Sequence, residues 1–370
     1  MINHKFSLSE RMEGRANNFD FIRLVCAIVV IFSHSYPLTK ANNNLEPLNL
    51  LTKGQWTFGG IAVAIFFVLS GFLVSRSFER TNIKQFLTNR FLRIFPGLAV
   101  AIILSALLLG PILTAIPLEQ YFKHSLTYSY LKNMFTVNIQ YGLPGVFETN
   151  IYPNAVNGSI WTIPYEVLCY LLVLFLGYYG LLKKEKSLLL IFVILFVISK
   201  VLPIQYGLIN LNGFVVVNLI ELLLFFVMGM LYYGYRNHIK FKDSWAGISL
   251  GILVISLFIG DFKTIFLFLG TYLIFYLSYH PKIKLHNCSK FGDFSYGVYI
   301  YAFPVQQIVQ LYLNQQTSAY INFIISLTVT FVLAVFSWHL VEKPALKLKE
   351  KSGFLIKEQT HNSITTRGEL

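Results

Sequence analysis

Two ionisable side chains lie eleven positions apart in the apolar segment FDFIRLVCAIVVIFSHSYPL, residues 19–38. In a helix of about 3.6 residues per turn, Arg23 and His34 fall on one face, roughly 16 Å apart along the axis. Asp20 precedes Arg23 by one turn and is expected to pair with it. Ionisable groups inside a membrane span usually face a bundle interior or a wet cavity. The shared face favours one internal path, and the alternative is two separate interfacial residues.

A carboxylate occupies the first turns of another apolar segment. Glu166 lies in NGSIWTIPYEVLCY, residues 157–170, on the half of its expected span that matches the depth of His34. An imidazole and a carboxylate at one depth form a general base with its orienting partner, which is the chemistry of hydrolases and acyltransferases. The alternative is a carboxylate that hydrogen-bonds within the bundle and only stabilises packing.

Arginines gather where two further segments meet. Arg90 and Arg93 lie one turn apart in RFLRIFP, residues 90–96, and Arg76 ends FFVLSGFLVSR, residues 66–76. Guanidinium groups bind phosphate, either of a cofactor or of lipid headgroups, and the motif alone favours neither. Ser70 and Gly71 are expected to allow close helix approach.

The composition indicates a polytopic membrane protein. Of 370 residues, 55% are hydrophobic and only 13% are charged, whereas soluble domains carry about 25% charged residues. Apolar runs long enough to cross a bilayer predict about ten transmembrane helices in an all-α integral membrane protein. The expected spans are 19–37, 57–75, 94–113, 160–182, 187–203, 214–234, 245–261, 263–279, 293–313 and 319–341.

The distribution of positive charge predicts the orientation. With the N-terminus in the cytoplasm, 23 of the 30 Lys and Arg residues fall on the inner side, six fall outside, and Arg23 lies within the first span. Inner loops rich in Lys and Arg are typical of membrane proteins, so both termini are expected to be cytoplasmic. This distribution also explains the net charge of +13 without a nucleic-acid partner.

The connections and ends complete the expected organisation. Residues 114–159 form a long outer segment, rich in aromatic residues, that is expected to be partly ordered and functional. Residues 76–93 are expected to form a basic interfacial helix on the inner side. The membrane domain is expected over residues 1–349, followed by a short polar cytoplasmic tail at 350–370. The three cysteines, Cys26, Cys169 and Cys288, suggest neither a disulfide framework nor a metal site.

Two later motifs carry polar residues at span ends. In FGDFSYGVYIYAFPV, residues 291–305, Asp293 opens the ninth expected span and Pro304 interrupts it. In SWHLVEKPALKLK, residues 337–349, His339 and Glu342 are expected to be interfacial.

Taken together, these stretches resemble the membrane-bound acyltransferase family 3. The resemblance rests on Arg23 with His34, on FFVLSGFLVSR, RFLRIFP, SIWTIPYE, SYGVYIYAFP and on the closing VEKP, and it covers residues 19 to about 349. It implies about ten helices and transfer of an acyl group, commonly acetyl from acetyl-CoA, to a hydroxyl of an extracytoplasmic carbohydrate or lipid-linked glycan. It also implies that His34 is catalytic and that Arg23 is required. Many relatives carry a second histidine at the position of Ala302, so His34 is the main candidate base here.

The expected mechanism joins the two faces of a bacterial inner (plasma) membrane. Acyl-CoA would dock through Arg90 and Arg93, with Arg76 as a weaker candidate, and its pantetheine arm would pass Arg23. His34, oriented by Glu166, would then deprotonate the acceptor hydroxyl. An acyl-His34 intermediate is the alternative route. The competing class is a transporter or flippase of a lipid-linked sugar, since intramembrane Arg and His also mark permeation paths.

Overall fold

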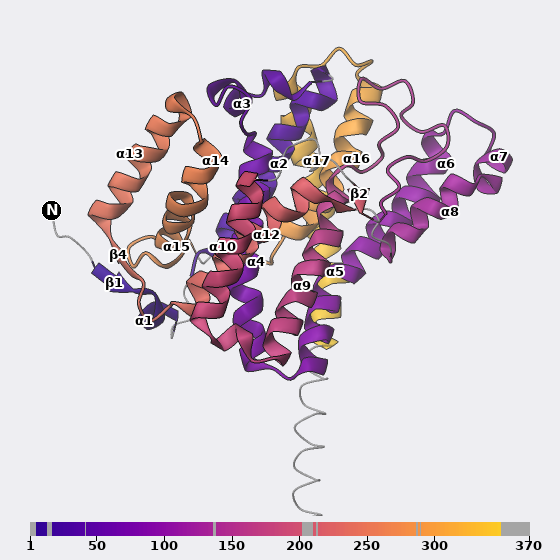
Figure 1. The fold of residues 1–370 in the computed structure, drawn as a ribbon. Coiled ribbons are helices and arrows are strands. Elements are labelled where there is room, and N and C mark those ends of the chain that lie inside the picture. The colour runs from indigo at the N-terminus through magenta and orange to yellow at the C-terminus, as the bar shows by residue number, and fades with distance from the viewer. Residues whose placement is uncertain are drawn as a thin grey trace, which may run out of the picture.

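A computed structural model describes residues 5–12, 17–40, 42–135, 138–201, 210–211, 214–285, 288 and 290–348. The expected tail at 350–370 lies outside these residues. The described chain is almost entirely helical (Figure 1), which confirms the all-α class. A bilayer favours this outcome because every backbone polar group of a helix is satisfied within its own segment.

Each expected span corresponds to a helix. The long helices are α2 (Phe19–Lys40), α4 (Phe58–Arg80), α5 (Ile83–Leu104), α9 (Ile163–Tyr178), α10 (Glu185–Val201), α12 (Val216–Gly234), α13 (Asp243–Ile259), α16 (Ser295–Tyr312) and α17 (Ala319–Ser337). π-Helical turns at Ser105–Leu109, Phe266–Gly270 and Trp338–Glu342 join α5 to α6 (Gly110–Leu113) and α14 (Phe262–Ile265) to α15 (Thr271–Tyr279), and extend α17.

Seven of the described helical segments are long and apolar enough to cross a membrane. The helices α10 and α13 have only 17 residues each. Helix α16 carries three buried glutamines, Gln306, Gln307 and Gln310, which lower its apolar character. The protein is therefore a multi-pass membrane protein, while ten spans and two cytoplasmic termini stay predictions.

The expected interfacial helix at 76–93 is wrong. Helix α4 continues to Arg80, and α5 already begins at Ile83, where the side chain of Asn82 accepts a hydrogen bond from the Gln85 amide at 2.8 Å. The helical spacing in this stretch was correct, but it belongs to the first turns of the third long helix. The charged residues in these turns lower the local mean hydropathy, so a hydropathy window does not assign them to the span.

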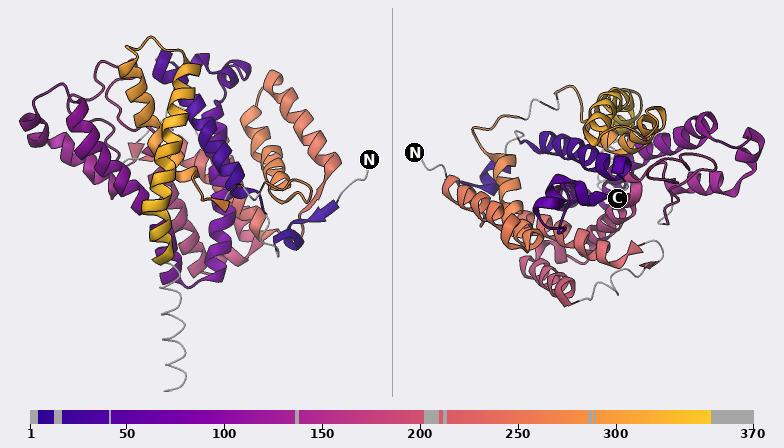
Figure 2. Two further views of the ribbon diagram at one scale, coloured as in Figure 1. Left: turned by 180° about the vertical axis from the view of Figure 1, so that it is seen from behind. Right: turned by 90° about the horizontal axis from the view of Figure 1, so that it is seen from above.

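The helices form one bundle with two lateral extensions (Figures 1 and 2). Helix α4 packs against α2, α9 and α12, and α16 packs against α2 and α17. The α13–α15 hairpin stands on one side of the bundle. On the other side, α6 leads to α7 (Leu118–Lys123) and α8 (Ser125–Leu131).

Several short elements precede α2 or lie between the long helices in the sequence. Strand β1 (Lys5–Ser7) pairs antiparallel with β4 (Lys240–Lys242), with Phe6 opposite Phe241, and α1 (Leu8–Met12) follows β1. Strands β2 (Asn210–Leu211) and β3 (Phe214–Val215) form a second small pair. Helix α3 (Pro47–Leu51) lies between α2 and α4.

The segment 114–159 is partly ordered, as expected. Besides α7 and α8 it contains a 3-10 turn at Lys132–Met134. The Tyr121 hydroxyl donates to the Ala106 carbonyl oxygen at 2.7 Å and anchors α7 to the end of α5. Burial raises the pKa of Tyr121 to about 12, so the hydroxyl stays a donor.

The closest helix crossing joins α4 and α12, as Gly71 predicted. A Cβ added at Gly71 would lie 1.9 Å from the Phe226 carbonyl oxygen, and one added at Gly229 would lie 2.0 Å from that of Val68. We expect Gly71→Ala to lower the free energy of unfolding by about 1–3 kcal/mol, because the two backbones must separate. Denaturation in mixed micelles would measure the change.

The matched control is Gly247→Ala in α13, where an added Cβ meets nothing within 4 Å. We expect it to be neutral or to stabilise by up to about 1 kcal/mol, since Ala is the better helix former. Equal effects of the two substitutions would contradict the close-crossing explanation.

Candidate active site

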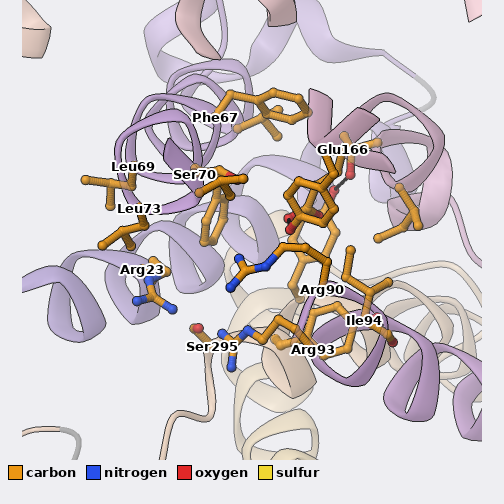
Figure 3. A pocket seen from close by; sticks show the side chains of 18 residues that line it. Arg23, Phe67, Leu69, Ser70, Leu73, Arg90, Arg93, Ile94, Glu166 and Ser295 are labelled. Atoms are coloured by element: carbon orange, nitrogen blue, oxygen red, sulfur yellow. Dashed lines mark hydrogen bonds between the residues drawn. The ribbon is translucent and has the colours of Figure 1, made fainter. Parts of the chain in front are cut away.

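A cavity of about 130 Å³ lies inside the bundle where α2, α4, α5, α9 and α16 meet. Apolar side chains of α4 line one wall. The opposite side carries charged and hydroxyl groups, and the guanidinium groups of Arg23, Arg90 and Arg93 point into the same space (Figure 3). We call this space the arginine cavity. The cavity thus brings together four of the predicted site residues: Arg23, Arg90, Arg93 and Glu166.

Asp293 links two of these arginines. Its Oδ2 lies 3.0 Å from Nη1 of Arg23 and 2.7 Å from Nη2 of Arg93, and its Oδ1 accepts from the Ser295 hydroxyl at 2.6 Å. Arg23 also pairs with Asp20 at 2.9 Å, as predicted. The side chains of Asp293, Arg23 and Arg93 are 13%, 20% and 23% exposed. This largely buried ion-pair cluster fastens α2, α5 and the start of α16 to one another.

Arg90 differs from the other two arginines. Among the described residues it has no carboxylate partner within 4.0 Å, and its buried Nε has no hydrogen-bond partner. Its guanidinium lies 5.6 Å from the ring centroid of Tyr170, whose hydroxyl donates to Glu166. Arg90 is therefore the cation of the cavity that is free to bind an incoming anion.

Arg76 does not join the cavity. Its Nη2 donates to the Met12 carbonyl oxygen at 3.1 Å, which holds α1 against the C-terminal part of α4. The prediction of a cofactor contact for Arg76 has no support in this geometry.

Glu342 is not interfacial, contrary to expectation. It is buried, its Oε1 accepts from the Ser337 hydroxyl at 2.8 Å, and its Oε2 has no partner. The π-helical turn Trp338–Glu342 turns this side chain inward, toward Gly97 and Gly297. Sequence hydropathy missed it because a carboxylate near a span end normally faces headgroups or water.

His34 lies near the C-terminal end of α2. Its ring is half-buried and meets the ring of Phe303 edge-on at a centroid distance of 5.4 Å. Its Nδ1 is buried and has no hydrogen-bond partner among the described residues. Ala302, where the resemblance led us to compare a second histidine, is fully buried.

The predicted partnership of His34 with Glu166 is not formed. Glu166 hydrogen-bonds to Tyr170 and lines the arginine cavity, whereas His34 packs on Phe303 outside that lining. The two residues stand on helices α9 and α2, and the face of α9 that carries Glu166 turns toward α5. Depth in the membrane was a poor guide because it leaves the direction of a side chain around its helix undetermined.

Helix α16 contacts both the arginine cavity and His34. Tyr296, Tyr299 and Phe303 follow one another at spacings of three and four residues and therefore lie on one helix face. Tyr296 and Tyr299 line the arginine cavity, and Phe303 contacts His34. The sequence analysis did not single out these three aromatic residues, although their spacing in SYGVYIYAFP is the signal that could have found them.

The part of the chain that the structure describes holds no group of three His, Cys, Asp or Glu residues that could bind a metal ion. Cys26, Cys169 and Cys288 are unpaired.

The fold and the site thus define a multi-pass membrane protein with a buried cationic cavity and a separate histidine. Residues 17–339 match the family described as acyltransferase domain. An O-acetyl transferase of Shigella phage Sf6 is 31% identical over 347 residues, which cover 89% of this chain and 96% of that protein. Nodulation protein 10 of Rhizobium leguminosarum bv. viciae is 28% identical over 367 residues, covering 92% and 96%. No solved structure matches the chain.

The chain therefore belongs to this acyltransferase family, and the resemblance found in the sequence is confirmed. The protein is a membrane acyltransferase that transfers groups other than aminoacyl groups. This finding decides between the two classes that the sequence left open, since the family is described as an acyltransferase domain and the phage relative is named as an O-acetyl transferase.

Proposed function

We propose that the protein moves an acyl group, acetyl by preference, from cytoplasmic acyl-CoA to a hydroxyl of an extracytoplasmic carbohydrate or lipid-linked glycan. The setting would be the inner (plasma) membrane of a bacterial cell. One observation supports the proposal: a single face of α16 both lines the arginine cavity and contacts His34. The O-acetyl transferase name of the phage relative supports acetyl as the transferred group.

The donor would bind through its phosphates. Arg90 has no carboxylate partner among the described residues, so a phosphate oxygen is its natural complement. Arg93 and Arg23 already share Asp293 and would contribute positive potential more than direct contacts. Glu166 would act here, beside Tyr170, in shaping the donor site, and not as the orienting partner of His34.

The distances suit a CoA thioester. Arg23 and His34 are separated by roughly 16 Å along α2. A pantetheine arm contains about as many backbone bonds as four extended residues, which reach about 14 Å. A nucleotide held at the arginine cavity could therefore present its thioester near His34.

The chemistry requires one base at the thioester. Nε2 of His34 would take the proton of the acceptor hydroxyl as its oxygen attacks the acyl carbon. The new ester bond forms, the carbon–sulfur bond breaks, and the proton passes from His34 to the leaving thiolate, which departs as CoA. In the two-step alternative the acyl group first bonds to His34 and then moves to the acceptor.

Arg90→Gln tests the donor site. We expect it to raise the Kd for CoA about 10- to 100-fold, because a charge-assisted hydrogen bond to phosphate is lost. Isothermal titration calorimetry on the purified protein in detergent would measure the change. Arg80→Gln is the control, since Arg80 is exposed at the end of α4. Equal affinities of the two variants would contradict the assignment.

The activity itself is tested by release of free thiol from acetyl-CoA, with and without a cell-envelope glycan extract. Release that requires the extract, together with ester-linked label in the glycan, is the expected result. Intact acetyl-CoA with every extract, although CoA binds, would point to another acyl donor.

A further inference from the structure

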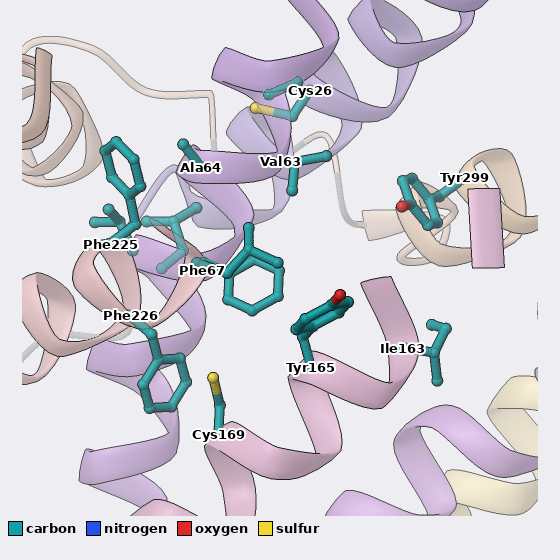
Figure 4. Packing of buried hydrophobic residues seen from close by; sticks show 14 of the residues in the cluster. Cys26, Val63, Ala64, Phe67, Ile163, Tyr165, Cys169, Phe225, Phe226 and Tyr299 are labelled. Carbon is teal, nitrogen blue, oxygen red and sulfur yellow. The ribbon is translucent and has the colours of Figure 1, made fainter. Parts of the chain in front are cut away.

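A small group of buried polar residues lies against α16 between Tyr296, which lines the arginine cavity, and Phe303, which contacts His34. The Tyr299 hydroxyl donates to the Ser159 carbonyl oxygen at 2.8 Å and lies 2.8 Å from Oγ1 of Thr162. The phenol has a single proton, so Thr162 donates to the Tyr299 oxygen. Figure 4 shows Tyr299 of α16 in the same part of the bundle as Ile163 of α9 and Val63 of α4. Tyr299, Thr162 and Ser159 are all buried, and we call them the Tyr299 cluster.

Asn157 fixes the Tyr299 cluster to α16. The Asn157 side chain donates to the Ile300 carbonyl oxygen at 2.8 Å and accepts from the Ser159 amide at 3.0 Å. A Cβ added at Gly158 would lie 2.5 Å from the Phe303 ring, so this segment presses on the residue that contacts His34. The position and hydrogen bonds of the three polar groups are therefore set before any ligand arrives.

One group of the Tyr299 cluster lacks a partner within the part of the chain that the structure describes. There the hydroxyl oxygen of Ser159 is buried without a hydrogen bond, which carries a free-energy cost unless a ligand supplies the missing partner. The surrounding walls, including Val63, Phe66 and Phe67, are apolar. A ligand that passes here must be slender and must bring its own hydrogen-bonding groups.

We propose that Tyr299, Thr162 and Ser159 form the subsite for the amide groups of the pantetheine arm of the acyl donor. This proposal rests on the proposed function, in which the arm leads from the arginine cavity to His34. An amide of the arm would accept from the Tyr299 hydroxyl in place of the Ser159 carbonyl and would pair with the free Ser159 hydroxyl. A plain hydrocarbon chain would leave these groups unsatisfied.

The test compares two probes that differ only in the arm. CoA carries the pantetheine arm, whereas 3′-phosphoadenosine 5′-diphosphate is its nucleotide head with all three phosphates and without the arm. We expect Tyr299→Phe and Thr162→Val each to weaken CoA binding about three- to ten-fold, the effect of one hydrogen bond, and to leave binding of the diphosphate unchanged. Calorimetry on the full-length protein in detergent would measure both affinities.

Two further variants keep the outcome clear. Ser159→Ala removes only the unpartnered hydroxyl and retains the carbonyl that Tyr299 uses, so it should fold normally and still weaken CoA selectively. Tyr301→Phe, on another face of α16 where its hydroxyl meets Ser337 at 3.3 Å, should change neither affinity.

The possible results separate this subsite from the function on which it rests. Wild-type affinity for CoA in the Ser159 and Tyr299 variants, with Arg90→Gln still weakening both probes, would overturn the subsite and retain the donor site. A wild-type protein that binds neither CoA nor the diphosphate would overturn the proposed function and the subsite with it.

Discussion

We expect His34→Ala to lower the rate of acyl transfer about 100- to 10,000-fold, the usual contribution of a general base. The CoA affinity of this variant should be unchanged, because His34 lies outside the arginine cavity where the phosphates would bind. Thiol release from acetyl-CoA in the presence of a glycan extract measures the rate, and calorimetry measures the affinity. Both the direct route and the acyl-His34 route require this imidazole.

The control for this experiment is His238→Ala. His238 is 70% exposed and lies 3.9 Å from Glu185, far along the sequence from the arginine cavity lining, so its loss should leave turnover unchanged. An unfolding curve for each variant checks that the half-buried His34 ring, which packs on Phe303, is not simply needed for folding. Full turnover in a normally folded His34→Ala protein would refute both routes.

The helices could be predicted from the sequence because a bilayer leaves the chain few choices. Long apolar runs must be helical in lipid, where no water satisfies the backbone. The boundaries were harder. Helix α5 begins at Ile83, whereas the sequence predicted a start at residue 94. The prediction was wrong because the first turns of α5 carry Arg90, Arg93 and other polar residues, which resemble a connection between helices.

The site could be predicted only where its contacts are local. Arg23 pairs with Asp20 because the two residues stand one turn apart on the same helix. Asp293 also hydrogen-bonds to Arg23, although the two residues lie 270 positions apart in the sequence. The periodicity of a sequence does not predict which helices pack against each other. Glu166 shows the same limit, since its predicted partner was His34, whereas its side chain lines the arginine cavity and accepts from Tyr170.

The free and occupied arginines also could not be told apart in sequence. RFLRIFP presents Arg90 and Arg93 as equivalent. In the fold, Arg93 meets Asp293 at 2.7 Å while Arg90 lies over the ring of Tyr170. The distinction arises because residues three apart on a helix differ by about 60° in direction, enough to give them different neighbouring helices.

Asp293→Asn should lower the free energy of unfolding by roughly 3 kcal/mol, because it leaves two partly buried guanidinium groups without their shared carboxylate. Titration with SDS in mixed micelles measures the change. Asp261→Asn is the matched control. Asp261 pairs with Lys200 at 3.3 Å, their side chains are 62% and 46% exposed, and such a surface pair contributes at most about 1 kcal/mol.

Inorganic phosphate distinguishes electrostatic loss from a packing defect in the Asp293 variant. An anion that enters the arginine cavity can take the place of the missing carboxylate between Arg23 and Arg93. Phosphate should therefore stabilise Asp293→Asn more than it stabilises the wild-type protein, and the difference should shrink as NaCl screens the charges. A variant that loses stability without any response to phosphate would show that Asp293 acts through packing, and a variant as stable as Asp261→Asn would show that the cluster does not fasten α2, α5 and α16.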